Sequence, residues 1–318
     1  MTVESHTSAK PPVKPRGGAA GDIQAKLMLV ALCLLWGVTW PAMKIALVEI
    51  PPLSMRTLTA AAGAVTLLAI CLAARTRLRV PTNAWGHVVA IAFLNIGAFS
   101  LLTAYAQVAA ATSRVTILIY TMPIWAVLLA WIVLREKPNA RQLLSVVLCA
   151  LGLVALIAPV AATGVPLGLL LAVAAGASWG AGTVYVKWAR LDIDSLALAF
   201  WQLVVAFILI AACLLLFDGR LDIDRAHAPA LLATAFSGIV GSGIAYAMWF
   251  AIVRRLSAAT ASLGALGIPV VGVLSTVLIV GERPTTTDLI GFGLIFAASA
   301  CVLWAPSAAA RQRKALTR

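Results

Sequence analysis

The chain has 318 residues, of which 62% are hydrophobic and 11% are charged, and its mean hydropathy is +1.01. Ordinary soluble domains are about 45–50% apolar and about 25% charged, so this composition excludes a soluble globular protein. The net charge of +13 does not indicate a nucleic-acid-binding protein, because the basic residues are scattered between long apolar blocks. Each block has about the 20 residues that a helix needs to cross a bilayer, which predicts an all-α polytopic membrane protein.

The apolar blocks, taken in chain order, predict ten transmembrane helices joined by short connections. Residues 1–26 are polar, partly basic and rich in Pro and Gly, which predicts a disordered cytoplasmic tail without a signal peptide. The ten expected helices cover residues 27–48, 53–74, 84–105, 115–134, 141–159, 167–187, 195–217, 229–252, 258–280 and 288–305. Residues 307–318 are expected to form a basic cytoplasmic tail.

The distribution of lysine and arginine predicts how these helices are oriented. If the N-terminus is cytoplasmic, 18 of the 24 basic residues fall on the cytoplasmic side, in the two tails and four loops. Lys44 lies within a helix, and the outer side receives only Arg56, Arg114, Arg220, Arg225 and Arg283. Because cytoplasmic loops are enriched in Lys and Arg, the sequence predicts a multi-pass protein of the inner (plasma) membrane with both termini in the cytoplasm.

Two sequence elements recur in the second half of the chain. Trp36 and Lys44 recur 143 positions later as Trp179 and Lys187. The segment PIWAVLLAWIVLREKP, which begins at position 123, recurs 146 positions later as PVVGVLSTVLIVGERP. These recurrences predict two five-helix units, residues 27–160 and 166–306. An odd number of helices per unit places the copies in opposite orientations, an arrangement found in many secondary transporters.

The segments SRVTILIYTMPIWAVLLAWIVLREKP and TASLGALGIPVVGVLSTVLIVGERPTTTDLIGFGLIFAASACVL resemble the two repeats of the EamA family, which belongs to the drug/metabolite transporter superfamily. The resemblance covers nearly the whole chain after residue 26. It implies ten helices around a central cavity and the export of amino acids or related metabolites. It does not define the substrate, because the family is broad and no substrate-specific motif is present.

The lysines of the Trp-Gly…Lys elements allow two interpretations. Trp36, Trp40 and Lys44 lie four residues apart and therefore share one helix face. Each lysine either lines the cavity and binds an anionic group, or extends from the end of its helix to the lipid headgroups. The second interpretation fits Lys187 better, because Trp188 and Arg190 lie beside it.

Proline residues near the middle of two expected helices point to the position of the site. Pro123 and Pro269 lack the amide donor that the carbonyls of Ile119 and Ala265 would need. Such interruptions at mid-membrane are typical of transporter binding sites, although a packing kink without ligand contact has the same signature. We expect the two prolines to act as hinges.

The expected site is an aromatic cavity at the membrane midplane that binds a small molecule. Asn95 would add a donor and an acceptor, although hydrogen bonding between helices would also explain it. Tyr105 and Tyr246 are matched between the halves in this interpretation. The expected substrate-binding residues are Trp36, Trp40, Lys44, Asn95, Tyr105, Tyr120, Trp179 and Tyr246.

Other chemistries have little support in the sequence. The five cysteines lie in apolar blocks and the three histidines show no metal-ligand spacing, so we expect no metal and no cofactor. No Asp or Glu lies deep in an expected helix, and Glu136 and Glu282 are expected to anchor loops by pairing with Arg135 or Arg283. One alternative is a drug or nucleotide-sugar carrier of the same superfamily. A membrane enzyme acting on lipid-linked substrates would need a cluster of His, Asp or Glu, which is missing from the helix ends.

Overall fold

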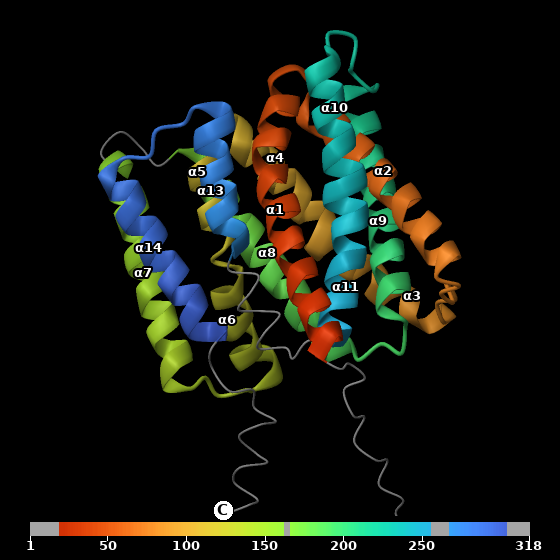
Figure 1. Cartoon of the computed structure of the whole chain (residues 1–318), viewed down its shortest axis with the longest axis horizontal. Coiled ribbons are helices and arrows are strands. Elements are labelled where there is room, and N and C mark those ends of the chain that lie inside the picture. The colour runs from red at the N-terminus through yellow and green to blue at the C-terminus, as the bar shows by residue number, and fades with distance from the viewer. Residues whose placement is uncertain (1–18, 162–165, 256–266, 304–318) are drawn as a thin grey trace, which may run out of the picture.

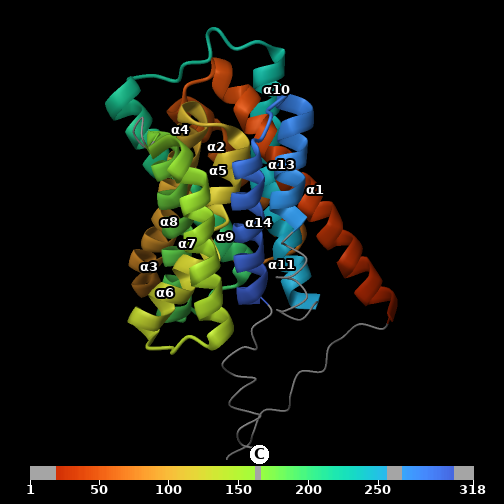
Figure 2. The same cartoon turned by 90° about the vertical axis from the view of Figure 1, so that its left-hand side faces the viewer.

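The computed structural model describes residues 19–161, 166–255 and 267–303, and within these ranges it is a bundle of helices without strands (Figure 1). The first helix begins and the last helix ends on the same side of the bundle, as two perpendicular views show (Figures 1 and 2). We call this side the termini side and the opposite one the far side.

The first half of the chain contains three continuous helices, α1, α2 and α7, and two stretches that are interrupted, α3–η2–α4 and α5–α6. Its elements are α1 (Ala19–Glu49), α2 (Pro52–Ala73), η1 (Thr82–Ala84), α3 (Trp85–Ala92), η2 (Phe93–Ala98), α4 (Phe99–Ala109), α5 (Thr112–Ile119), α6 (Met122–Leu134) and α7 (Ala140–Ala161). The second half follows the same succession with α8 (Leu167–Ala189), α9 (Ser195–Cys213), η3 (Leu214–Asp218), α10 (Ala228–Phe236), η4 (Ser237–Ile244), α11 (Ala245–Arg255), α13 (Gly267–Val280) and α14 (Thr286–Leu303).

Eight helical stretches in the described residues are long and apolar enough to cross a membrane. They correspond to the first eight expected helices and make this a multi-pass membrane protein. The apolar helices Gly267–Val280 and Thr286–Ala298 fall in the last two expected spans but are shorter. Residues 258–266, the first part of the expected ninth span, lie outside the described residues.

The start of α1 requires a correction to the expected N-terminal tail. The helix begins at Ala19, whereas residues 1–26 were expected to be disordered and the first span to begin at residue 27. Its apolar part does begin at Leu27. The preceding residues include Ala, Gln and Lys, which favour a helix, and extending a helix that is already formed costs little free energy.

The fourth expected span is broken at the position that the proline predicts. Helix α5 ends at Ile119 and α6 begins at Met122, with Pro123 as its second residue. The amide of Tyr120 donates to the Ile117 carbonyl at 3.0 Å, a tighter turn than that of an α-helix. Pro269 is the third residue of α13, and the carbonyl of Ala265 lies outside the described residues.

A glycine of α8 makes room for this break. A Cβ on Gly176 would lie 3.0 Å from the Ile119 carbonyl oxygen and 2.8 Å from Thr121 Oγ1. Any other residue at this position would push α8 away from the end of α5. The break and the helix that contacts it are therefore fitted to each other.

The third and eighth expected spans each contain a π-helical segment, which the sequence did not predict. The segments η2 and η4 end at Ala98 and Ile244, 146 positions apart, the same offset that separates Pro123 from Pro269. A π-helical turn disturbs the regular backbone hydrogen bonds, and such turns are frequent at functional sites. Side chains from the other half of the chain bind both segments: Trp36 Nε1 donates to the Gly241 carbonyl at 2.9 Å and Ser178 Oγ to the Leu94 carbonyl at 2.7 Å.

Helix packing follows a similar correspondence between the halves. Helix α1 packs against α13, and α8, its counterpart, packs against α6. The pairs α2 with α9 and α7 with α14 each join one helix to its counterpart, and Figure 2 shows α7 beside α14. Corresponding helices point in opposite directions, since α3 begins on the termini side and α10 on the far side (Figure 1).

Candidate functional site

Five aromatic residues from four helices and both halves of the chain form a cluster inside the bundle. We call Trp36 of α1, Phe99 of α4, Trp179 of α8, and Tyr246 and Trp249 of α11 the aromatic cluster. Ring centroids are 5.8 Å apart for Trp36 and Tyr246, 6.5 Å for Trp179 and Tyr246, 4.8 Å for Phe99 and Trp179, and 6.1 Å for Trp36 and Trp249. All five side chains are half-buried.

The geometry of the cluster is fixed by ring contacts and by a backbone hydrogen bond. Trp36 meets Tyr246 edge to face, with an interplanar angle of 82°, and Phe99 meets Trp179 at 63°. Such arrangements are favourable for aromatic quadrupoles. The hydrogen bond from Trp36 to the η4 backbone also fixes the orientation of its indole. The accessible ring faces, with the phenol of Tyr246, suit an amphipathic ligand that has an apolar part and a few polar groups.

Three of the expected site residues, Trp36, Trp179 and Tyr246, thus lie together. Phe99 and Trp249 were not among the expected residues. Helical spacing is a signal that was available, because Phe99 lies four residues after Asn95 and Trp249 lies three residues after Tyr246.

Asn95 lies in the π-helical segment η2 and is used between helices. Its Nδ2 donates to Gln202 Oε1 of α9 at 3.3 Å. Its Oδ1 is buried against Gly182 of α8, where no Cβ could be accommodated, and has no partner among the described residues. The structure therefore shows the helix-to-helix hydrogen bond, one of the two interpretations of this residue.

Lys44 and Trp40 take part in a hydrogen-bonded link between α1 and α4. Lys44 Nζ donates to the Gln107 carbonyl at 2.7 Å, near the far-side end of α4. Gln107 Nε2 in turn donates to the Trp40 carbonyl at 3.2 Å, and the Trp40 side chain is 8% exposed within the apolar core. A cation at the C-terminal end of a helix interacts favourably with its free carbonyls. Lys44 thus has a structural partner that neither expected interpretation contained.

The two remaining tyrosines lie in different surroundings. Tyr120 occupies the break between α5 and α6 and packs against the apolar core that contains Trp40. Tyr105 is 42% exposed near the end of α4. Because η2 and η4 end at Ala98 and Ile244, the structural register does not match Tyr105 with Tyr246, and the expected pairing needs this correction.

Polar contacts join the two halves on the far side. Arg114 of α5 holds Asp288 of α14 through Nε at 2.6 Å and Nη2 at 3.1 Å. The carboxylate of Glu282 accepts hydrogen bonds from the amides of Thr112 and Ser113, at 2.6 and 2.9 Å, and so caps the start of α5. We call these interactions of Arg114, Asp288, Glu282, Thr112 and Ser113 the far-side contacts. All residues of α5 except Arg114 are buried.

The two loop glutamates that recur between the halves therefore pair differently from expectation. Glu282 binds backbone amides instead of Arg283. Glu136, its counterpart, pairs with Lys187 on the termini side instead of Arg135. In each case the partner group is distant in sequence, backbone amides for Glu282 and the Lys187 side chain for Glu136, so the neighbouring residues could not predict it.

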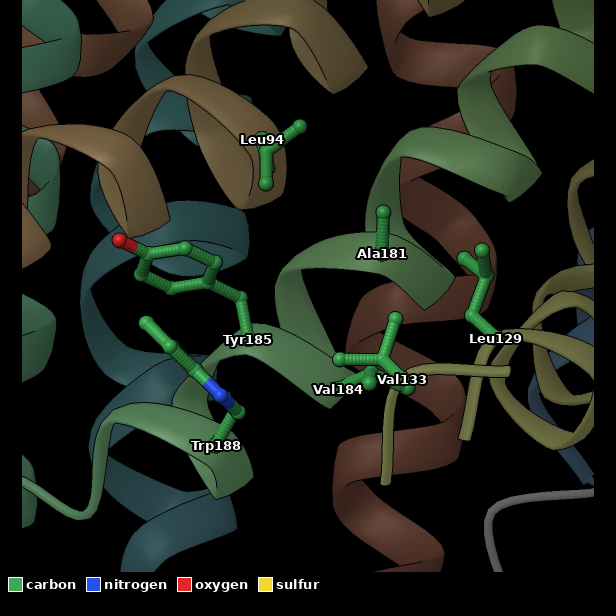
Figure 3. A pocket seen from close by; sticks show the side chains of 7 residues that line it. All are labelled: Leu94, Leu129, Val133, Ala181, Val184, Tyr185 and Trp188. Atoms are coloured by element: carbon green, nitrogen blue, oxygen red, sulfur yellow. The ribbon is translucent and has the colours of Figure 1, made fainter. Parts of the chain in front are cut away.

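An apolar groove of about 330 Å³ lies between η2, α6 and α8 (Figure 3). Tyr185 and Trp188 form one side of it, and Leu129 and Val133 the opposite side, with Leu94, Ala181 and Val184 between them (Figure 3). Tyr185 has its hydroxyl 3.0 Å from Nδ1 of His87. The groove contains none of the expected site residues. Within the described ranges, no three His, Cys, Asp or Glu side chains are placed to hold a metal ion.

Comparisons with known proteins agree with this architecture. A chain titled "Crystal structure of protein" superposes with a TM-score of 0.62 at 23% identity, covering 92% of this chain and 99% of that one, which shows a shared fold. The "Uncharacterized transporter YoaV" of Bacillus subtilis is 24% identical over 86% of this chain and 94% of its own. A protein of Salmonella typhimurium named "Probable amino-acid metabolite efflux pump" is 24% identical over 85% of this chain and 91% of its own.

The family comparison accounts for both halves of the chain separately. The model of the EamA-like transporter family matches residues 24–158 and again residues 166–304. The two matches leave only the segment around the α7–α8 connection and the two ends of the chain outside. The protein thus belongs to the EamA-like transporter family.

Proposed function

We propose that this protein is a secondary transporter of the inner membrane that exports small metabolites, amino acids or related compounds among them, by alternating access. In this proposal ten helices form two inverted five-helix repeats, and the termini side is cytoplasmic. The observation that carries the proposal is the aromatic cluster, because both halves contribute to it and its rings remain half-buried inside the bundle. A site shared by two repeats is one that their relative motion can expose to either side.

The distribution of polar contacts supports alternating access. The far-side contacts join α5 to Glu282 in the α13–α14 connection and to Asp288 of α14, and the short helix α5 is buried there except for Arg114. Helix α6, which continues from α5 toward the termini side, packs mainly against α8 in the described part of the chain. In this proposal, the far side is the closed side. In the proposed cycle the far-side contacts break, and the breaks near Pro123 and Pro269 act as hinges.

The chemistry of the cluster supports amphipathic substrates. The proposed substrate contacts are Trp36, Trp179 and Tyr246, and the proposed polar groups of the site are Asn95 and Tyr120. In this proposal Trp40, Lys44 and Tyr105 support the helices around the site and do not touch the substrate. Aromatic faces favour aromatic or branched amino acids over highly charged compounds. Relatives in Salmonella typhimurium and Escherichia coli, each 24% identical, carry the name "Probable amino-acid metabolite efflux pump".

A metabolite-export profile tests the proposal. Cells that overproduce the protein are compared with cells that overproduce the Trp36→Ala variant at equal amounts of folded protein in the membrane. We expect one or more amino acids or related metabolites to accumulate in the medium with the wild type only. Identical media from wild-type and vector-only cells, across amino acids and related metabolites, would contradict the proposal.

A further inference from the structure

Arg56 is a buried arginine whose guanidinium is unpartnered along one edge. It lies in the second turn of α2, near the far-side end, and is 7% exposed. Within the part of the chain that the structure describes, its buried Nε and Nη2 atoms have no hydrogen-bond partner, and the ion pairs found there do not include it. A guanidinium keeps its charge in proteins, and burying a charge without a partner is costly.

In the described part of the chain, none of the elements that pack on α2 forms an ion pair with Arg56. Helices α4, α9 and α10, the segment η4 and α2 itself contain no Asp or Glu. Helix α1 and the segment η3 also contact α2 and end in Glu49 and Asp218, but Glu49 pairs with His227 and neither carboxylate pairs with Arg56. Leu53 and Leu67, which lie on the same face of α2 as Arg56, pack in an apolar cluster with α9. Asp222 comes to this end of α2, where its amide donates to Ser54 Oγ at 2.9 Å, but it forms no ion pair with Arg56.

The free edge is the one that holds a carboxylate elsewhere in the molecule. Arg114 binds the two oxygens of Asp288 with Nε and Nη2, the same pair of atoms that Arg56 leaves unpartnered. Two parallel N–H groups on this edge match a planar carboxylate, which offers one oxygen to each N–H, whereas a single chloride ion would have to be shared between them.

We propose that Arg56 binds the carboxylate group of a ligand through Nε and Nη2. The identification of this ligand with an exported amino acid rests on the function proposed above. Since Arg56 is buried near the far-side end of α2, a carboxylate reaches it when the far-side contacts open. The site therefore belongs to the stage at which substrate leaves on the far side, and the uncompensated charge is a cost that the fold carries for binding.

The test measures binding separately from transport. Thermal unfolding of the full-length protein in detergent is followed with L-phenylalanine or sodium acetate, and at equal ionic strength with L-phenylalaninamide or sodium chloride. We compare the wild type with Arg56→Lys and Arg56→Met, and with Arg220→Met as the matched control, because Arg220 is an exposed arginine of the same side in an i,i+4 pair.

We expect the two carboxylates, but not the amide or chloride, to raise the unfolding temperature of the wild type and of Arg220→Met. Arg56→Lys keeps the charge without the paired N–H groups and should bind about tenfold more weakly or worse. Arg56→Met should lose the effect while unfolding at no lower temperature than the ligand-free wild type, because it removes an unpaired charge. If Arg56→Met does not fold, Arg56→Lys decides the question.

Equal carboxylate effects in the wild type and the Arg56 variants would overturn the proposal, as would a chloride effect equal to that of acetate or no carboxylate effect in the wild type. These outcomes are distinct from a failure of the proposed function. Loss of the carboxylate effect in Arg56→Met together with no export by the wild type would leave the binding site standing and reject export. Export by the wild type, with an unchanged carboxylate effect in Arg56→Met, would support export and reject the Arg56 site.

Discussion

The two halves of the chain follow the same succession of helices but end them with different residues. Helices α2 and α6 end on the termini side with Arg75 and Arg135 in the left-handed conformation, at φ 52° and 54°. Their counterparts in the second half end on the far side with Gly219 and Gly281, at φ 77° and 78°. A left-handed residue other than glycine costs about 1–2 kcal/mol. The proposed orientation would account for the arginines, because basic residues are enriched on the cytoplasmic side of membrane proteins.

The first turns of α7 and α14 also differ in charge between the two halves. Asn139 and Gln142 cap α7 by reciprocal hydrogen bonds of 2.8 and 2.9 Å. Thr285 and Asp288 cap α14 in the same way, at 2.8 and 3.3 Å. Only the second pair includes a charge, and Asp288 also binds Arg114. The cap is thus common to both halves, whereas the ion pair that joins α14 to α5 is present on the far side.

Removing that charge should give the largest difference between corresponding positions. Asp288 is 4% exposed, so Asp288→Asn leaves Arg114 without its counter-charge. We expect the free energy of unfolding to fall by about 2 kcal/mol or more, a value below that of a fully buried pair because Arg114 is partly exposed. The matched Gln142→Ala variant should lose about 1 kcal/mol or less, the value of a cap. Denaturant unfolding measures both, and equal losses would show that the far-side contact adds nothing to the cap.

Gly182 of α8 lies at a close approach to η2, whereas Gly293 of α14 lies in open space. A Cβ on Gly182 would collide with the Asn95 side chain, whereas a Cβ on Gly293 would meet nothing within 4 Å. Gly182→Ala should therefore lower the free energy of unfolding by about 1–3 kcal/mol through overpacking. Gly293→Ala should leave it unchanged or raise it slightly, because alanine favours a helix. Thermal unfolding of the two variants decides between packing and helix propensity, and a stable Gly182→Ala variant would show that Asn95 is free to move.

The hydrogen bonds to the π-helical segments η2 and η4 provide a comparison in which the halves should behave alike. Trp36→Phe leaves the Gly241 carbonyl without its donor, and Ser178→Ala does the same for the Leu94 carbonyl. Each change should cost about 1 kcal/mol in the free energy of unfolding. Hydrogen exchange of the η2 and η4 amides should report the change in the segment concerned. A change in neither segment would mean that water replaces these side chains.

The smallest expected effect concerns the left-handed helix ends. Arg135→Gly should raise the free energy of unfolding by up to about 1 kcal/mol, because glycine adopts this conformation without strain. Gly281→Ala should lower it by a similar amount. As a control, a cysteine introduced at position 136 or 282 is labelled in intact and in permeabilised cells. The labelling shows whether each variant keeps the membrane orientation of the wild type. A less stable Arg135→Gly variant would show that the arginine side chain contributes contacts that offset the strain.

Part of this structure could be predicted from the sequence because it depends on single residues. The break between α5 and α6 follows from the missing amide of Pro123, and the membrane-length helices follow from the length of the apolar blocks. Trp36 and Trp179 could be placed together in the expected cavity because the Trp-Gly…Lys element that contains them recurs in the two halves. Where one residue type decides the backbone, the sequence was a sufficient guide.

Other features depend on distant partners and could not be predicted in this way. The Lys44 ammonium finds a carbonyl of α4, and Glu282 finds the amides of α5, contacts that exist only after the helices pack. No residue in η2 or η4 signals that the helix is π-helical there. The sequence therefore aligned the two halves incorrectly in this region and matched Tyr105 with Tyr246. Arg56 could be counted as a charge of the outer loops, but only packing shows that it is buried.

The aromatic cluster, to which both halves contribute, is the proposed binding site of the transported substrate. Uptake of a labelled amino acid into preloaded proteoliposomes, measured for the substrate that the export profile identifies, tests it most directly. Trp36→Ala and Trp179→Ala, one variant in each half, should each reduce transport about tenfold or more, because both rings supply apolar contact area to the ligand. Trp131→Ala, which removes a 48% exposed ring of α6 outside the cluster, should transport at the wild-type rate. Wild-type transport by both cluster variants, at equal amounts of reconstituted folded protein, would contradict the account.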